Sequence, residues 1–169
     1  TVQVNSVATW TGAFVTLNTI AQGLASNARV GDNIKMIKLT VRFDWEISSN
    51  VNSVGRMIVF MDKQNEIAVI TDILNAGGGI LATNGNKNYQ QRFKTKFLYD
   101  RKFPLQNGGN ELYTVNKIIN IYKHTEYEPN STNIETGALK LLYLSNIDPT
   151  VTGALPQFRA TFKLTYTDS

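Results

Sequence analysis

Alternation of apolar and polar side chains is the feature of this sequence that most constrains its fold. From Ile37 to residue 47 every odd position is apolar, whereas the even positions carry charges or hydroxyl groups. Successive side chains of a strand point to opposite faces, so a period of two predicts one buried and one solvated face. Residues 158–167 repeat this pattern. So do residues 92–103, where we expect four side chains to point inwards: Phe93, Phe97, Tyr99 and Phe103.

Five further segments are typical of strands: residues 2–10, 14–20, 56–61, 115–124 and 139–145. Of these, 56–61 is a continuous apolar run, which predicts a strand covered on both faces. Helix is expected only near 68–75, with Thr71 as the N-cap. The connections are long and rich in Gly and Asn, which favours Greek-key links. We therefore expect one all-β domain over residues 1–169, an eight-stranded antiparallel jelly-roll sandwich of two Greek-key sheets with long loops.

Size and composition fit a single globular domain. The chain has 169 residues, 42% of them hydrophobic, which is enough for a core that needs neither disulfides nor metals. It has no cysteine, so disulfide scaffolds, thiol catalysis and cysteine-bound zinc are excluded. No apolar run has the length of a membrane span, and no membrane partner is expected.

The sequence offers little for catalysis. His124 is the single histidine, and no spacing of a Ser-His-Asp triad accompanies it. Glycine-rich phosphate loops and zinc-protease motifs are absent, and Gly77–Gly79 lacks the Lys-Ser/Thr that follows a Walker loop. Two carboxylate pairs at same-face spacing are the only candidates for a glycosidase: Asp44 with Glu46, and Glu126 with Glu128. We expect solvated charge there, no enzyme activity, and no required cofactor.

Basic residues are the more informative signal. The net charge is +4 and the isoelectric point is about 9.3, a mild bias towards polyanions. Two clusters lie on predicted strands and are candidate nucleic-acid contacts: Lys35, Lys38 and Arg42, and Arg92, Lys94 and Lys96. Phosphate contact needs positive charge alone. Lysines on exposed strands also discourage uncontrolled strand pairing, and both interpretations stay open.

The order of several segments carries a resemblance. Gly31-Asp32 leads into the long alternating strand, GRMIVFMDKQ (55–64) is followed by ITDIL (70–74), then QRF (91–93), LYDRKFPL (98–105) and a terminal YTDS (166–169). This order resembles the jelly-roll capsid proteins of circular Rep-encoding single-stranded DNA viruses and of satellite viruses of the tobacco necrosis satellite type. Residues 31–105 and the last strand carry the similarity, whereas 106–153 match only in strand pattern.

The resemblance implies a structural function. Sixty copies would form a T=1 icosahedral shell in the virion, assembled inside the host cell around a single-stranded genome, DNA in preference to RNA. It also implies a basic N-terminal arm before Thr1, and a calcium ion at subunit contacts. The calcium would be bound by Asp168 with backbone groups near Val30 and Asn33. A host receptor is implied but no residue identifies it.

A binding module is the alternative from another class. Lectin-like and trimeric cytokine-like domains also use the jelly roll, and a carbohydrate module needs an exposed aromatic platform. Four aromatic residues are candidates for such a platform: Trp10, Tyr113, Tyr122 and Tyr127. A β-sandwich hydrolase that uses the carboxylate pairs named above is the third hypothesis.

Overall fold

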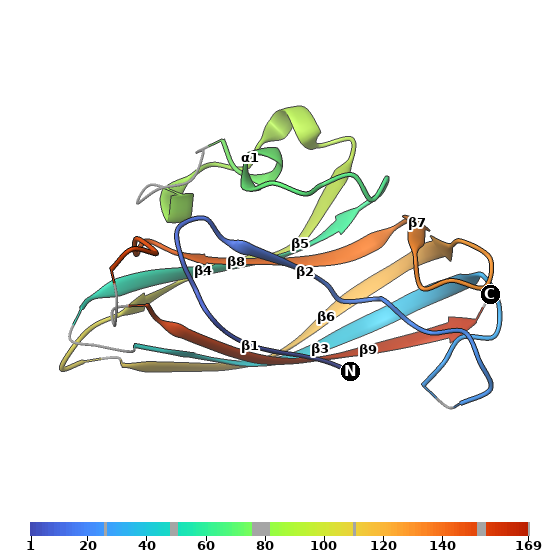
Figure 1. The fold of residues 1–169 in the computed structure, drawn as a ribbon, viewed down its shortest axis with the longest axis horizontal. Coiled ribbons are helices and arrows are strands. Elements are labelled where there is room, and N and C mark those ends of the chain that lie inside the picture. Colours follow the sequence, from blue (N-terminus) through green and yellow to red (C-terminus); the bar gives the residue numbers. More distant parts are fainter. Residues whose placement is uncertain (26, 48–50, 76–81, 110, 152–154, 169) are drawn as a thin grey trace.

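Two antiparallel β-sheets face each other and enclose the core (Figure 1). The computed structural model describes residues 1–25, 27–47, 51–75, 82–109, 111–151 and 155–168; the Gly77–Gly79 loop lies outside them. The strands in the described residues are β1 (Val2–Val7), β2 (Ala13–Thr16), β3 (Asn33–Glu46), β4 (Ser53–Asp62), β5 (Thr95–Leu105), β6 (Leu112–Tyr127), β7 (Ile134–Thr136), β8 (Ala138–Ser145) and β9 (Gln157–Asp168). The helical turns are α1 (Ile70–Ile73), η1 (Ala82–Asn84) and η2 (Tyr89–Gln91).

The sheets have the orders β1-β9-β3-β6-β7 and β2-β8-β4-β5. The prediction of an all-β, two-sheet antiparallel structure with little helix is confirmed, and each of the eight predicted segments contains a strand. The ninth strand, β7, was not predicted; it has three residues and pairs only with the end of β6. No helix among the described residues is long and apolar enough to cross a membrane.

The core between the sheets is built from inward positions of β3, β6 and β9 in one sheet and of β4, β5 and β8 in the other. The Trp45 ring lies 4.9 Å from that of Phe158, and the Phe43 ring lies 5.0 Å from that of Phe103. Trp45 also lies against Gly55 of β4, where a Cβ atom would come within 2.1 Å of the indole ring. Glycine at position 55 is therefore what allows the largest core side chain to sit between the sheets.

A β-bulge between Met36 and Lys38 changes the alternation of β3. Leu39 to Trp45 point inwards at odd positions as predicted, but Ile34 and Met36 are the buried residues before the bulge. Ile37 is only partly buried, so its predicted inward position is wrong. A bulge inserts one extra residue into a strand, and the alternation shifts by one position at that point.

The beginning of β5 also differs from the prediction. Phe93 is 74% exposed, because the chain makes a turn after η2 and the strand starts only at Thr95. A bulge opposite Val59 and Phe60 then places Phe97 on the outer side of its sheet. Tyr99 packs towards the core between the sheets, as predicted.

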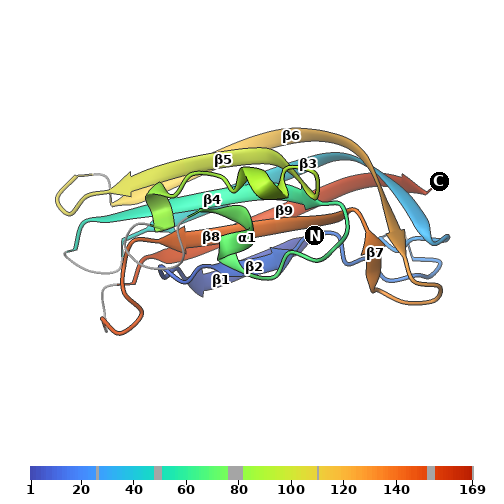
Figure 2. The ribbon, with the colours of Figure 1, turned by 90° about the horizontal axis from the view of Figure 1, so that it is seen from above.

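The connection between β4 and β5 covers the outer face of the four-stranded sheet. Seen from above, α1 lies over β8 and β4 (Figure 2). This confirms that the apolar run 56–61 is buried on both faces. The predicted N-cap is wrong, because Val69 holds that position and Thr71 lies inside α1. A second hydrophobic cluster fills the space beneath α1: Ile58, Phe60, Ile67, Ile70, Ile73, Leu74, Leu142 and Leu144.

Candidate anion-binding surfaces

The outer face of the five-stranded sheet carries the first predicted basic cluster. Lys35, Lys38 and Arg42 project from β3 and are exposed. The register places two further exposed cations on the same face of β9, since Lys163 is opposite Thr40 and Arg159 is opposite Asp44. We call this surface the open face; its cations are Lys35, Lys38, Arg42, Arg159 and Lys163.

The open face carries the carboxylates of Asp44 and Glu46 beside its five cations. Arg159 pairs with Glu46 at 3.3 Å. Within the part of the chain that the structure describes, the other four cations form no ion pair. Asp44 accepts a hydrogen bond of 2.7 Å from Thr114. Lysine, arginine and threonine side chains on a solvated sheet are suited to sequence-independent contacts with phosphates.

The second predicted cluster does not stay together. The Lys94 ammonium donates to Glu66 at 2.5 Å, and this hydrogen bond with the charge of Glu66 raises the pKa of Lys94. Arg92 and Lys96 instead line a cavity of about 440 Å³. Lys94 is therefore paired on the surface, while its two sequence neighbours contribute to a separate site.

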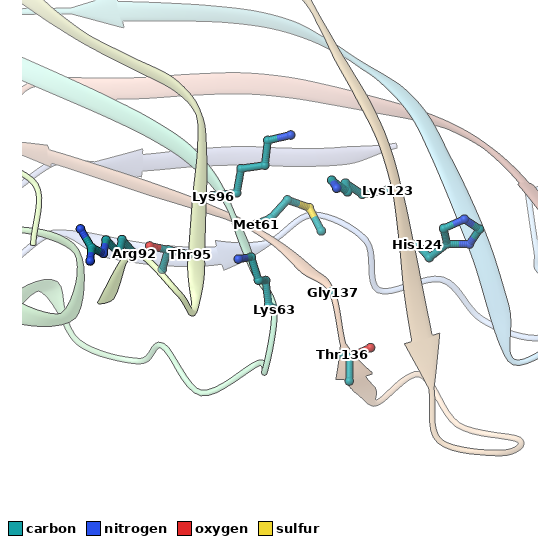
Figure 3. A pocket seen from close by; sticks show the side chains of 9 residues that line it. All are labelled: Met61, Lys63, Arg92, Thr95, Lys96, Lys123, His124, Thr136 and Gly137. Atoms are coloured by element: carbon teal, nitrogen blue, oxygen red, sulfur yellow. The ribbon is translucent and has the colours of Figure 1, made fainter. Parts of the chain in front are cut away.

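Two further lysines line this cavity, which we call the lysine cavity (Figure 3). Lys63 follows β4, Lys96 belongs to β5 and Lys123 to β6, so three chain segments each contribute a lysine to the lining around Met61. Arg92 lies on the other side of Thr95, and the imidazole of His124 points away from the cavity. Thr136 and Gly137 complete the lining.

Backbone contacts around Gly137 bring the walls of the lysine cavity together. The Gly137 N–H donates to the carbonyl oxygen of Lys63 at 3.2 Å, and Lys63 N–H donates to that of Lys94 at 2.8 Å. Gly137 has φ +73°, and a Cβ there would lie 2.3 Å from the carbonyl oxygen of His124. A residue with a side chain would be strained and would push β6 away.

The first predicted cluster thus lies on the open face, whereas only Arg92 and Lys96 of the second line the lysine cavity. Sequence reasoning missed Lys63, Lys123, Arg159 and Lys163. Alternation did place Arg159 and Lys163 on an outer strand face, but only the β3–β9 register joins them to Lys38 and Arg42. Lys63 and Lys123 are 60 positions apart, and no local pattern indicates that they meet.

The predicted calcium position has one carboxylate in this chain. Asp168 lies beside Val30, but it accepts a 3.3 Å hydrogen bond from the Val30 N–H, a donor that cannot bind a cation. The nearby Asp32 pairs with the buried Arg29 at 3.2 Å. Within the described ranges no three acidic or histidine side chains form a cluster. Calcium takes six to eight oxygens, so Asp168 does not fit a calcium site formed by one chain alone.

Of the remaining candidate residues, the second carboxylate pair and two of the four aromatic residues are engaged in local contacts or buried. Glu126 accepts from Thr136 at 3.1 Å and Glu128 from Asn133 at 2.7 Å. Of the four aromatic candidates for a carbohydrate platform, Tyr127 is 2% exposed and Tyr113 packs against Phe103. Tyr122 is 61% exposed and Trp10 is partly buried.

The sequence matches no protein-family model and no curated protein. The function is therefore inferred from the arrangement of the strands, from the two cationic surfaces and from the order of the sequence segments.

Proposed function

We propose that this chain is a jelly-roll coat protein that assembles with copies of itself into a small T=1 shell around a single-stranded genome. The nesting of the strand pairs carries the proposal. When the short β7 is set aside, the first strand pairs with the last, the second with the one before it, and so on inwards: β1 with β9, β2 with β8, β3 with β6, and β4 with β5. A jelly roll has eight strands in two Greek-key sheets, and this nesting is how one long hairpin winds into it.

Exposed apolar side chains on several separate loops support assembly. Leu24 is 99% exposed on the loop before β3, and Val69 is 53% exposed beside α1. Others lie at the ends of strands and in other connections: Val30, Val51, Leu112 and Val151. Single exposed apolar residues are ordinary. Their spread over many sides suits a subunit that meets neighbours about several symmetry axes, as a closed shell requires.

The charge of the open face supports its orientation towards the genome. Four of its five cations have no carboxylate partner in the described part of the chain. A shell must bind a genome of any sequence, and phosphate contacts from lysine and arginine meet that need without reading bases. We therefore assign the open face to the interior of the shell, with the genome as its partner. The resemblance favours DNA over RNA.

Light scattering coupled to size-exclusion chromatography tests the assembly. One chain has a mass of 18.8 kDa, so a shell of sixty copies is expected at about 1.1 MDa. A monomer at 18.8 kDa or a trimer at about 56 kDa would contradict the shell and favour the jelly-roll binding module instead. Comparison at low and high salt separates protein-driven assembly from assembly on nucleic acid, because only the second weakens steeply with salt.

A further inference from the structure

We propose that the lysine cavity is a second nucleic-acid site, which holds one phosphate of a single strand while a neighbouring base stacks on Phe93. The proposal rests on the proposed function only for the class of polyanion, since nothing in the cavity requires the chain to assemble. The cavity lies between the beginning of β5 and the end of β6, where Lys123 is opposite the buried Met36 and is therefore on the core side of β6.

The charges around the cavity call for an anion. Lys63, Lys96 and Lys123 line it together with Arg92, and no carboxylate belongs to its lining. Acidic side chains close to the lining in the sequence or in strand register are already engaged: Asp62 with Lys140, Glu66 with Lys94, and Glu126 with Thr136. Like charges that share a cavity repel, so an anion that all of them contact gains from each one.

The ammonium groups retain donors for a ligand. Lys63 uses one donor on the carbonyl oxygen of Phe93, at 2.9 Å, which leaves two of its three hydrogens free. Lys96 and Lys123 make no ion pair with a described residue. A cavity of about 440 Å³ accommodates a phosphate with part of its sugar. Lysine binds phosphate oxygens as a point charge and needs no fixed orientation of the ligand.

An exposed aromatic ring next to the cavity favours a single strand over other polyanions. Phe93 is 74% exposed and follows Arg92, which lines the cavity. The Arg92 guanidinium lies 4.8 Å from the centre of the Phe93 ring, so it joins the ring to the cavity wall. Proteins that bind single strands combine a positive groove with rings on which unpaired bases stack. A sulfated polysaccharide or free phosphate has no base to occupy Phe93.

Fluorescence anisotropy with labelled oligo(dT) tests the site, at protein concentrations where light scattering reports single subunits. The double variant K96Q/K123Q should bind about tenfold more weakly at low salt, and the slope of log affinity against log salt should fall by about 0.7, since the site holds one phosphate and each phosphate contact on a single strand contributes about 0.7. The control K102Q/K117Q removes the same charge from exposed lysines of the same two strands, outside the cavity. We expect it to change affinity less than twofold.

Separate ligands identify what the cavity recognises. F93L should weaken oligo(dT) binding several-fold and leave the response to inorganic phosphate, measured by amide NMR shifts of Thr95 and Gly137, unchanged. Equal losses in both double variants, or heparin binding that depends on the cavity while oligo(dT) binding does not, would overturn the proposal. So would inorganic phosphate binding as tightly as oligo(dT). Because binding is read on single subunits, failure here is distinct from failure of shell assembly, which the mass measurement reports.

Discussion

The two sheets have opposite outer faces, although both share one core. The outer face of the five-stranded sheet is open and carries lysines, arginines and threonines. The outer face of the four-stranded sheet is covered by the β4–β5 connection, and leucines, isoleucines and phenylalanines fill the space between them. One side of the sandwich is thus available for polyanions, while the other is closed by the chain itself.

Two buried ion pairs anchor the cover at its ends. Lys140 contacts Asp62 at 2.9 Å and donates to the carbonyl oxygen of Ile67, where the connection begins. Arg56 forms two 2.9 Å hydrogen bonds with Asp100. It also donates to the carbonyl oxygen of Gly85, in the part of the connection that leads back to β5. On the covered face these charged side chains form buried ion pairs, whereas four of the five cations of the open face form no ion pair with a described residue. This contrast predicts which substitutions destabilise the fold and which affect binding.

Removing Asp62 should have the largest effect on stability. D62A leaves the ammonium of Lys140 and the N–H of Ile67 buried without their partner, and the expected loss is about 3–5 kcal/mol in the free energy of unfolding measured with urea. K94A breaks the exposed pair with Glu66 and serves as the control; its loss should be much smaller, because an ion pair in solvent contributes little to stability. Equal losses would contradict a structural role specific to the buried pair.

The apolar contacts of the cover come next. Ile73 is 0% exposed beneath α1, so I73A should cost about 2–5 kcal/mol because it leaves a cavity. Ile118 is 59% exposed on β6, opposite Thr40 of the open face, and I118A should cost no more than about 0.5 kcal/mol. Urea denaturation of both variants measures the difference. Similar losses would mean that the open face is covered in solution.

Acid should weaken the second anchor. Burial raises the pKa of Asp100, but the hydrogen bonds and charge of Arg56, with the charge of Lys87, outweigh burial and leave that pKa below its ordinary value. A depressed carboxyl pKa stabilises the fold above the unfolded pKa of about 3.9 and loses that contribution as pH falls through the folded value. D100N should cost about 1–3 kcal/mol at neutral pH.

Urea midpoints from neutral pH down to about pH 3 measure this contribution, because the normal range of carboxyl titration lies in that interval. The stability difference between the parent chain and D100N should shrink as the pH falls. A difference that stays constant with pH would show that the charge of Asp100 does not hold the cover.

Substitutions on the open face should change binding and leave the fold intact. K38Q/R42Q should alter the free energy of unfolding by no more than about 0.5 kcal/mol, because both side chains are solvated. The same variant should reduce the nucleic acid carried by purified particles, read from the ratio of absorbance at the nucleic-acid and protein maxima. K102Q/K117Q, with the same loss of charge, should retain it. Equal nucleic-acid content in both would remove the open face as the lining.

Local patterns predicted the fold well where a strand is regular. Alternation placed Leu39 to Trp45 inwards, and the apolar run 56–61 indicated a second covered face. It failed at Ile37, Phe93 and Phe97, because bulges and turns shift the alternation without an obvious mark in the sequence. These are tertiary effects, decided by how neighbouring strands fit.

The candidate sites were predicted only in part, for the same reason. Lys38 and Arg42 share a strand, so alternation was enough to place them together on one face. Lys94 and Lys96 also share an alternating segment, yet Glu66 binds one while the cavity takes the other. The contribution of Lys63 and Lys123 depends on long-range pairing around Gly137, which no spacing in the sequence encodes.

Electron cryomicroscopy of the purified chain tests the central claim most directly, because it reports assembly and orientation together. We expect a closed icosahedral particle of sixty subunits in which the sheet bearing Lys38 and Arg42 faces the enclosed space and α1 faces outwards. A single subunit or a trimer would contradict the coat function. A closed shell with the open face on the outside would contradict the assignment of that face to the genome.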